Sequence, residues 1–590
     1  MLRKQRGVGP ALRLCLPRNV MLRNRGLIAA AFLLSLSARA QTPSAGPSPR
    51  ANVSTRVDNL FEKWDRTDSP GCALSVMKDG HIIYEHGYGM ADLDHNVIIT
   101  PSTVFHVAST SKQFTAASIV LLAQQGKLSF DDDIRKYILE LHDFGTPITI
   151  RELIHHTSGL RDQWGLLELA GWRYSLDLIT DDDIMSLVAR QKELNFKPGG
   201  REIYSNTGYT LLGLIVSRIS GMTLREFTTE NIFVPLGMKN THFRDDHSEI
   251  VKNNADGYQK VKDGQYRLSN TNFDTVGATS LHTTVEDLAI WDENFYHPRV
   301  GGANFPSQML ERGKLNSGEQ TDYAFGLALQ KYKGLPMVHH GGADAGYRSE
   351  LTRFPEQHFS TAVLCNASDT FPVLLAQQVA EIYLAEEMKA AAKGAMDAAE
   401  SKEVQLTAEQ LSGLAGVYWN RQDDSFIRTY VKDGKLHFTY GADGSDSLLA
   451  SVTATYFHQA DVPYGDQVNF RFEPSAPGKP GRLLNSYGEG KPDVFESVDT
   501  FAPNGSELAE YVGEYTSEEI DPVYRLMVQE GKLTLAWLKH KPIVLDPRTR
   551  DAFASSAGTI RFTRDPTGHI SGFLLSDGRI LNFRFTRQRK

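Results

Sequence analysis

The feature that most constrains the fold is a repeat in the last third of the chain. Two patterns occur there twice at the same offset: Leu414-Ala-Gly416-Val-Tyr418 with Tyr511-Val-Gly513-Glu-Tyr515, and Val431-Lys-Asp-Gly434-Lys-Leu436 with Val528-Gln-Glu-Gly531-Lys-Leu533. Two matches at one offset indicate two copies of a single structural unit. Short apolar runs between Gly turns predict antiparallel strands in each copy. We therefore expect two small β-barrels of about eight strands each, over residues 406–502 and 503–590.

Residues 56–390 have a different pattern, in which strand-like and helical segments alternate. Strands at both ends of this segment, with helices between them, predict one sheet flanked by helices. A stretch of small and charged residues, 391–405, predicts a linker to the barrels. The expected strands cover 73–77, 81–88, 337–340 and 361–365, and the expected helices cover 57–64, 109–125, 131–139, 181–192, 207–220, 284–296 and 373–392.

The amino-terminal segment has the pattern of an export signal. Arg23 and Arg25 precede an apolar run over 27–36, and small residues at positions 38 and 40 follow it. The run is too short to span a bilayer, which needs about 20 apolar residues. Its length is typical of the core of a signal peptide, so residues 1–40 are expected to be one.

The mature chain is expected to begin after cleavage near Ala40, with Met21 as an alternative start of the signal. Residues 41–55, rich in Pro and Ser, predict a flexible tether. The protein is then exported, to a periplasm or outside the cell, without membrane insertion. The formal net charge is −8, and the segment before Gln41 contains basic residues but no acidic ones. Removal of that segment makes the mature chain more acidic still, and such a chain is a poor partner for nucleic acid or for an anionic membrane.

Two cysteines remain after the predicted signal, Cys72 and Cys365, and both lie in apolar runs. Free cysteine is among the most buried residue types, so the pattern favours two inert core thiols. A single disulfide is the alternative, which an oxidising compartment permits. The cysteine pattern indicates neither a disulfide framework nor a metal site.

Ser109 and Lys112 form the sharpest chemical pattern in the chain. They lie three residues apart at the start of the helix expected over 109–125, which Gly126 would end. At this spacing both side chains lie on one face of the first turn, and the helix N-terminus favours a developing anion. Desolvation lowers the pKa of a lysine, so a neutral Lys112 is expected to take the proton of Ser109. By itself, however, Ser-x-x-Lys is typical of a solvated helix face.

Tyr204 and Asn206 lie two residues apart, just before the helix expected over 207–220. A tyrosine oxygen near a neutral lysine can shuttle protons, and an asparagine can position a substrate amide. The Tyr-x-Asn pattern carries no weight alone, and its meaning depends on the other motifs.

A third segment follows the late apolar strand, where His340 is succeeded by Gly341 and Gly342. Two glycines permit the close backbone approach that substrate binding beside an edge strand requires. His340 is expected to bond Tyr204 or the substrate. The N–H of Ala343, with that of the nucleophilic serine, would form an oxyanion hole.

In this order, the three segments resemble the motifs of the serine beta-lactamase and penicillin-binding-protein superfamily. Ser109-Thr-Ser-Lys112 resembles Ser-x-x-Lys, Tyr204-Ser-Asn206 resembles Tyr-x-Asn, and His340-Gly341-Gly342 resembles the Lys-Thr-Gly position in its His-x-Gly variant. Further segments resemble the class C-like branch, which comprises peptidase S12-type serine hydrolases: Ile154-His-His156-Thr-Ser-Gly-Leu160, Lys197-Pro-Gly-Gly200, Pro235-Leu-Gly-Met238 and Gly277-Ala-Thr-Ser-Leu-His-Thr-Thr-Val-Glu-Asp287.

The resemblance, which covers 56–390, implies both the fold and the residue roles. It implies an α/β domain with an antiparallel sheet flanked by helices and an all-α subdomain. It implies no metal and no organic cofactor, since an acyl-enzyme route needs only water as second substrate. The implied roles are nucleophile for Ser109, general base for Lys112, proton relay for Tyr204, substrate orientation for Asn206, support of Tyr204 and substrate for His340, and the oxyanion site for Gly342 and Ala343.

The third motif departs from class C beta-lactamases, which have Lys where this chain has His340. The His-x-Gly form resembles D-aminopeptidases, whose catalytic domain is likewise followed by two lipocalin-like β-barrels. The resemblance therefore favours a D-amino-acid peptidase that acts on small peptides. The alternatives are a carboxylesterase on the same scaffold, a beta-lactamase, for which the missing Lys weakens the case, and a non-catalytic penicilloyl-binding sensor. The oligomeric state stays open.

Three further features have more than one interpretation. Trp164, Trp172, Arg173 and Tyr174 either form part of a lid over the cleft or pack half-buried. The run 245–247, Asp-Asp-His, is interpreted as an exposed loop in preference to a metal site. The barrels either bring a loop to the catalytic cleft or bind cell-wall material.

Overall fold

The computed structural model describes residues 49–174, 176–392, 404–441, 446–460, 468–476, 480–487 and 490–588. The predicted signal peptide, and most of the predicted tether and linker, lie outside these ranges. Within them, no helix combines the length and the apolar composition that crossing a membrane requires.

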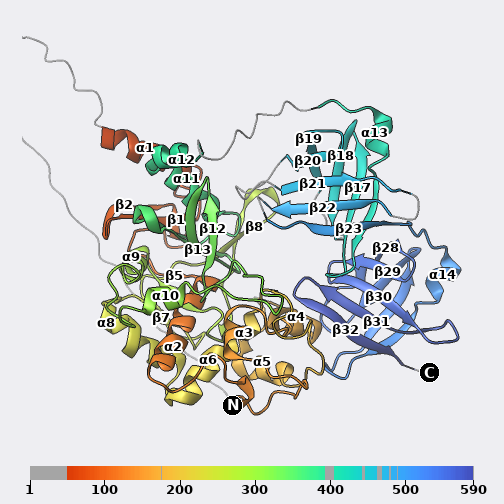
Figure 1. The fold of residues 1–590 in the computed structure, drawn as a ribbon, viewed down its shortest axis with the longest axis horizontal. Coiled ribbons are helices and arrows are strands. Elements are labelled where there is room, and N and C mark those ends of the chain that lie inside the picture. Colours follow the sequence, from red (N-terminus) through yellow and green to blue (C-terminus); the bar gives the residue numbers. More distant parts are fainter. Residues whose placement is uncertain are drawn as a thin grey trace, which may run out of the picture. The chain divides into compact units, whose positions relative to one another are not determined.

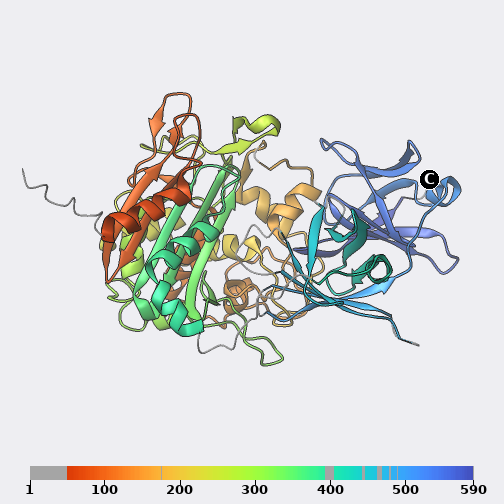
Figure 2. The same cartoon turned by 90° about the horizontal axis from the view of Figure 1, so that it is seen from above.

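A six-stranded antiparallel sheet forms the centre of the first domain. In sheet order its strands are β12 (Ala328–Tyr332), β13 (Leu335–Asp344), β14 (Tyr347–Phe354), β15 (Phe359–Cys365), β1 (Cys72–Lys78) and β2 (His81–Tyr88). On one face, α1 (Pro49–Phe61) and α11 (Pro372–Tyr383) pack beside each other (Figures 1 and 2). On the other face, α9 (Val285–Glu293) packs against β1 and β15. The predicted sheet flanked by helices is therefore confirmed.

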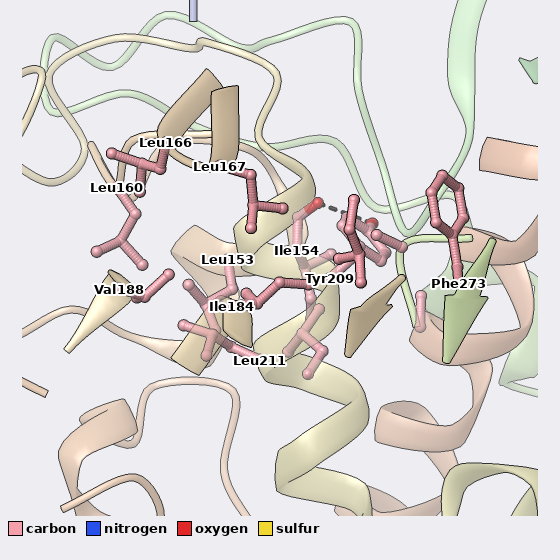
Figure 3. Close-up of a cluster of buried hydrophobic side chains, with 14 of the residues drawn as sticks. Leu153, Ile154, Leu160, Leu166, Leu167, Ile184, Val188, Tyr209, Leu211 and Phe273 are labelled. Atoms are coloured by element: carbon pink, nitrogen blue, oxygen red, sulfur yellow. Dashed lines mark hydrogen bonds between the residues drawn. The ribbon is translucent and has the colours of Figure 1, made fainter. Parts of the chain in front are cut away.

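Helices fill the region between β2 and β12, which we call the helical region. Its central helix, α6 (Asn206–Ser220), packs against α2 (Lys112–Gln124) and α3 (Ile150–Ile154). Figure 3 shows the apolar side chains of this core, where the Tyr209 hydroxyl donates a hydrogen bond to the Ile154 carbonyl (2.9 Å). The remaining helices are α4 (Gln163–Leu169), α5 (Asp181–Val188), α7 (Leu224–Thr228), α8 (Val234–Leu236), α10 (Phe305–Met309) and, after α11, α12 (Ala385–Ala392).

One predicted helix is wrong. Residues 131–139 contain only the short 3₁₀ turn Ile134–Lys136. Their backbone pairs with residues 148–150 instead, for example through the Ile134 N–H, which donates to the Ile148 carbonyl (2.8 Å). The same groups cannot also bond within a helix, so the long-range pairing excludes it.

Short strands connect the helices. They are β3 (Met90–Asp92), β4 (Val97–Ile98), β5 (Phe105–His106), β6 (Ile179–Thr180), β7 (His242–Phe243), β8 (Tyr258–Lys260), β9 (Tyr266–Leu268), β10 (Phe273–Asp274) and β11 (Leu281–Thr283). Among them, β5 and β7 pair with β11 and form a small sheet beside the start of α2.

The last part of the chain forms two antiparallel β-barrels, as the repeat predicts. The first is closed and consists of β16 (Gly416–Asn420), β17 (Ser425–Lys432), β18 (Lys435–Tyr440), β19 (Ser447–Ser451), β20 (Tyr456–Gln459), β21 (Val468–Glu473), β22 (Arg482–Tyr487) and β23 (Asp493–Val498). The second is a nearly closed nine-stranded sheet of β24 (Gly513–Thr516), β25 (Tyr524–Gln529), β26 (Lys532–Ala536), β27 (Ile543–Val544), β28 (Asp546–Thr549), β29 (Ala552–Ser555), β30 (Gly558–Arg564), β31 (Ile570–Asp577) and β32 (Ile580–Arg587).

The two copies of the repeat have the same local structure. A short helix precedes each barrel, α13 (Ala408–Ser412) and α14 (Gly505–Ala509). Tyr418 and Tyr515 each donate a hydrogen bond to the carbonyl four residues earlier, at 3.1 and 2.8 Å. The hairpin glycines Gly434 and Gly531 have φ values of 73° and 75°, in the left-handed region that glycine adopts without steric cost.

The second barrel and the helical region share one hydrophobic core. The Tyr524 hydroxyl donates to the carbonyl of Leu169, at the end of α4 (2.8 Å). Arg161 forms an ion pair with Glu519 of the barrel (2.7 Å), and both side chains are buried. Breaking such a pair leaves a buried charge without compensation. The barrel is therefore an integral part of the packing around the helical region.

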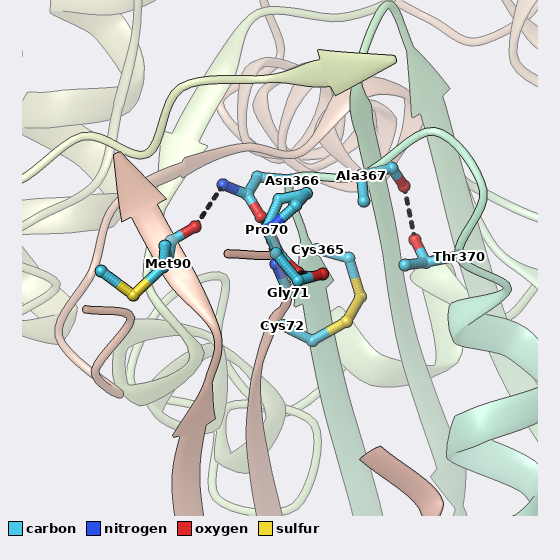
Figure 4. The surroundings of a disulfide bond; sticks show 9 residues. Pro70, Gly71, Cys72, Met90, Cys365, Asn366, Ala367 and Thr370 are labelled. Carbon is cyan, nitrogen blue, oxygen red and sulfur yellow. Dashed lines mark hydrogen bonds between the residues drawn. A yellow bond between two sulfur atoms is a disulfide. The ribbon is translucent and has the colours of Figure 1, made fainter. Parts of the chain in front are cut away.

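Cys72 and Cys365 form a disulfide, so the interpretation as two free thiols is wrong (Figure 4). The two residues lie directly opposite each other on β1 and β15. Beside them, the Asn366 side chain accepts a hydrogen bond from the Gly71 N–H (2.8 Å) and donates one to the Met90 carbonyl (3.0 Å). The cysteines are 293 residues apart in sequence, and only the pairing of the first strand with the last brings their sulfurs together.

We expect the disulfide to stabilise the folded chain by about 2–4 kcal/mol, because it restricts the unfolded state of a long loop. Reduction should therefore lower the midpoint of unfolding in guanidinium chloride. The Cys72→Ala/Cys365→Ala double variant is the control, since its own lower midpoint should not respond to the reductant. Equal midpoints for the oxidised and reduced wild type would contradict this expectation.

Candidate active site

Ser109 lies in the 3₁₀ turn Ala108–Ser111, which leads directly into α2. Ala108 has a φ of 47°, an uncommon conformation for a residue with a side chain. Strained backbone of this kind concentrates at functional sites. The Ser109 Oγ lies 3.0 Å from the Lys112 Nζ, so the two side chains meet as their spacing predicts.

Lys112 is completely buried. Its Nζ lies 2.8 Å from both the Asn206 Oδ1 and the Ala278 carbonyl oxygen, in addition to Ser109. Burial lowers the pKa of Lys112 to about 7, because desolvation penalises the charged form. The amide and carbonyl oxygens can only accept, so a neutral amine donates both its hydrogens to them. Its lone pair is then directed at the Ser109 hydroxyl.

Asp162 orients Asn206, and none of the sequence motifs identified it. Its Oδ2 accepts hydrogen bonds from the backbone N–H (2.6 Å) and the side-chain amide (2.8 Å) of Asn206. With the amide nitrogen engaged, the amide oxygen faces Lys112. Asp162 also caps α4, where it accepts from the Trp164 N–H (3.0 Å). An Asp just before a helix is its one local signal, and its contact with Asn206 arises from the fold alone.

Tyr204 packs over the same lysine. The centroid of its ring lies 4.9 Å from the Lys112 Nζ and 4.2 Å from the ring of His156. Its hydroxyl is buried and has no partner at normal hydrogen-bond geometry among the described residues. Burial raises the pKa of Tyr204 above its usual value, while the nearby Ser109 hydroxyl and then the charge of Arg579 act in the opposite direction. A tyrosine that keeps its proton is suited to protonate a leaving group.

His340 does not bond Tyr204, contrary to one of the two expectations for it. Its Nε2 lies 2.8 Å from the Tyr323 hydroxyl, and its Nδ1 lies 2.7 Å from the Gly341 carbonyl. Burial lowers the pKa of His340 to about 3, so the ring is neutral. The Nδ1–H therefore donates to the carbonyl, and the Nε2 accepts from Tyr323. Tyr323 precedes β12 and belongs to none of the motifs, which is why the sequence did not indicate this partner.

The strand β13 lies inside the sheet, but its second half behaves as an edge. β12 pairs with it only as far as His339, whereas β14 pairs with it to Asp344. Within the described sheet, residues 340–344 therefore have a neighbouring strand on one side only. Gly342 packs tightly there, because a Cβ atom would lie 2.3 Å from the Val107 carbonyl oxygen. The edge position thus arises because the pairing with β12 ends at His339, whereas glycine is needed at position 342 because the Val107 backbone lies against it.

A cavity of about 560 Å³ brings the predicted residues together. Trp164 and Tyr174 form part of its wall, in edge-to-face contact at 5.3 Å, as the lid interpretation expects. Trp172 and Arg173 line a neighbouring cavity instead. The predicted residues in the lining are Ser109, Tyr204, Asn206, His340, Gly342 and Ala343, and Lys112 lies beneath Ser109.

The family model described as Beta-lactamase matches residues 57–384. The chain belongs to the beta-lactamase family. It is 25% identical to a D-aminopeptidase of Gluconobacter oxydans over 457 residues, which are 77% of this chain and 81% of that protein. It is 29% identical to a penicillin-binding protein of Bacillus subtilis over 334 residues, 54% of this chain and 73% of that one.

Among solved structures, this member of the beta-lactamase family matches the octameric penicillin-binding protein homologue from Pyrococcus abyssi. The TM-score is 0.54 at 22% identity, over 75% of this chain and 100% of that one. The likeness concerns the fold. Together with the family match, the relatives identify the chain as a serine hydrolase of the beta-lactamase family.

One group of side chains in the described ranges has the spacing of a metal site. Asp246, His247 and Asp274 place their ligand atoms within 4.8 Å of one another, and His247 Nδ1 contacts the Asp274 carboxylate (3.0 Å). Asp246 and His247 are exposed, as the loop interpretation expects, and none of the three lines the cavity of the beta-lactamase-family site.

We expect kcat/KM for a neutral substrate to fall tenfold per unit as the pH drops below about 7, because only the neutral Lys112 amine accepts the Ser109 proton. Because the pKa of Lys112 is lowered to about 7, its neutral form predominates above that pH, and kcat/KM levels off there. The pH dependence of kcat/KM measures this. Lys112→Arg, which keeps its charge at every such pH, should lose about 10²–10⁴-fold. A flat profile through neutral pH would exclude Lys112 as the base.

Asp162→Asn should lower kcat/KM by about 100-fold, because an amide oxygen accepts the two hydrogen bonds from Asn206 more weakly than the carboxylate and orients it less firmly. Removing the nearby negative charge should also shift the acid limb of the pH profile to lower pH, since that charge raises the pKa of Lys112. Asp521→Asn, which alters an exposed carboxylate paired with Arg190, should behave like the wild type. An unchanged kcat/KM in Asp162→Asn would contradict the orienting role.

Proposed function

We propose that this chain is an exported D-amino-acid peptidase, which hydrolyses small amide substrates through an acyl-enzyme on Ser109. The observation that carries the proposal is the contact between the Ser109 Oγ and the amine of a buried Lys112. This pair lies at a cavity that Tyr204 and Asn206 also line. The cavity is of a size that suits a small ligand.

In the proposed reaction, the Lys112 Nζ removes the proton of Ser109 as its Oγ attacks the substrate carbonyl carbon. The N–H groups of Ser109 and Ala343 stabilise the oxyanion. As the C–N bond breaks, the Tyr204 hydroxyl gives its proton to the leaving amine and regains one from Lys112. Water then attacks the acyl ester, its proton passes to the neutral Lys112, and the Ser109 oxygen is reprotonated as the acid leaves.

The preference for D-amino acids is supported by the similarity to the D-aminopeptidase, which extends over 77% of this chain and so beyond the matched catalytic domain. His340 in the third motif agrees with this reading. A carboxylesterase is the second candidate, because the same steps cleave an ester. The Tyr204 hydroxyl, which keeps its proton, can protonate either leaving group, and an alkoxide needs less help from it than an amine.

Export is supported by the signal-like pattern before Gln41 and by the Cys72–Cys365 disulfide. Structural disulfides persist in oxidising compartments and are rare in a reducing cytosol. The proposal therefore includes a periplasmic or secreted location.

The test is the release of p-nitroaniline from D-alanine and L-alanine p-nitroanilide by the purified chain. We expect turnover of the D form, and loss of at least about 10³-fold in Ser109→Ala. Turnover of the L form alone would contradict the stereochemical assignment. Hydrolysis of p-nitrophenyl esters without either anilide would replace the peptidase by the esterase. A stoichiometric burst that never turns over would indicate an acyl-binding protein.

A further inference from the structure

Arg579 of the second barrel reaches the catalytic cavity. It lies in the turn between β31 and β32, and it lines the same cavity as Ser109. Its guanidinium carbon lies 4.8 Å from the centroid of the Tyr204 ring. A second cavity of about 610 Å³ also has Arg579 in its wall, and it shares Trp164 and Tyr174 with the first. Arg579 therefore lies where the cleft continues beyond Tyr204.

The helical region holds this turn by its backbone. The Asn195 side chain accepts a hydrogen bond from the Leu581 N–H (2.7 Å) and donates one to the Arg579 carbonyl (2.9 Å). Ile580 packs against Gly165, where a Cβ atom would lie 2.5 Å from the Ile580 Cδ1. The position of the turn is thus determined by contacts that do not involve the guanidinium. That group remains available to a ligand.

The guanidinium of Arg579 forms no ion pair with a carboxylate of the described residues, although the charge of Asp577 in the same turn interacts with it. No carboxylate oxygen of the described residues lies within 4.0 Å of it. Asp344, the one acid in the cavity lining, is fully engaged: its Oδ1 accepts from Tyr174 (2.5 Å), and its Oδ2 contacts His106 (2.9 Å) and Thr279. Burial by itself would raise the pKa of Asp344, but these hydrogen bonds hold it below its usual value.

The lining of the first cavity has more positive than negative side chains. Arg348 lines the cavity as well, and it donates hydrogen bonds to the carbonyls of Ala345 (3.0 Å) and Tyr347 (2.7 Å). Asp577 precedes Arg579 in the turn but lines only the second cavity. The lining of the first cavity thus contains two guanidinium groups and one carboxylate, whose oxygens are already engaged. Such a lining favours an anionic group on the substrate.

We propose that Arg579 binds a carboxylate on the leaving group of the substrate, and that it thereby selects short peptides whose free carboxyl terminus closely follows the scissile bond. This inference rests on the proposed function, in which Tyr204 protonates the leaving amine. The leaving group departs past Tyr204, and Arg579 lies against the ring of that residue. The planar guanidinium can donate two parallel hydrogen bonds to a carboxylate.

The experiment compares D-alanyl-glycine with D-alanyl-glycinamide, which share the scissile bond and differ in the carboxylate. We expect the wild type to prefer the acid in kcat/KM by roughly 10- to 100-fold, mainly through KM. Arg579→Met should abolish the preference, measured as the ratio of acid to amide, because the effect of its charge on Lys112 and Tyr204 is common to both substrates. Arg579→Lys should retain part of the preference. Arg525→Met, which removes an exposed arginine of the same barrel paired with Glu514, is the matched control and should keep the full preference.

Two outcomes would overturn the inference. The first is an equal ratio of acid to amide in the wild type and in Arg579→Met. The second is a preference dependent on Arg579 for N-succinyl-D-alanine p-nitroanilide over N-acetyl-D-alanine p-nitroanilide, with none for the dipeptide acid, because the bound carboxylate would then lie on the acyl side.

Calorimetric binding of both dipeptides to Ser109→Ala separates this inference from the proposed function. Tighter binding of the acid, lost in Ser109→Ala/Arg579→Met, supports the carboxylate site even where the wild type hydrolyses neither dipeptide. In that case the proposed peptidase reaction is contradicted, and the carboxylate site at Arg579 is supported. Equal affinities of the acid and the amide for Ser109→Ala overturn the site.

Discussion

The active site depends on the exclusion of water and of direct negative charge from one lysine. Lys112 is held by two neutral oxygens, those of the Asn206 amide and the Ala278 carbonyl, and its pKa falls to about 7. A carboxylate in direct contact would raise that pKa again. Asp162 does not contact the amine directly. It orients Asn206 through two hydrogen bonds, while the charge of Asp162 stays at a distance from the Lys112 amine.

The same short segment connects the site to the second barrel. Arg161 forms the buried ion pair with Glu519, and the N–H of Asp162 donates to the Arg579 carbonyl (3.3 Å). Asp162, which orients Asn206, is thus also fixed by a hydrogen bond to the second barrel. The barrel contributes to the packing of the site, and one of its turns contributes to the cavity wall. The first barrel contacts the helical region through Arg201, whose guanidinium donates to the Gln422 carbonyl (3.3 Å).

How well the sequence predicted each part depended on how far apart in the chain the interacting groups lie. Ser109 and Lys112 were predictable because a helix relates residues three apart by its own geometry. Tyr204, Asn206 and His340 were recognisable only by the order of their motifs. One of the two partners expected for His340, Tyr204, was wrong, since the Tyr323 hydroxyl reaches the ring through the packing of a loop. The helix expected over 131–139 failed for a related reason: long-range backbone pairing took up its hydrogen-bonding groups.

The sequence alone determined most of the local elements, the duplication of the barrels, and the placement of Ser109 and Lys112 at the start of one helix. These follow from backbone periodicity and turn chemistry, which act over a few residues. The tertiary structure alone decided that Asp162 meets Asn206, that Cys72 meets Cys365, and that Arg579 enters the cavity. Each of these contacts, and the desolvation of Lys112 itself, results from burial by segments far apart in the chain, which no local pattern records.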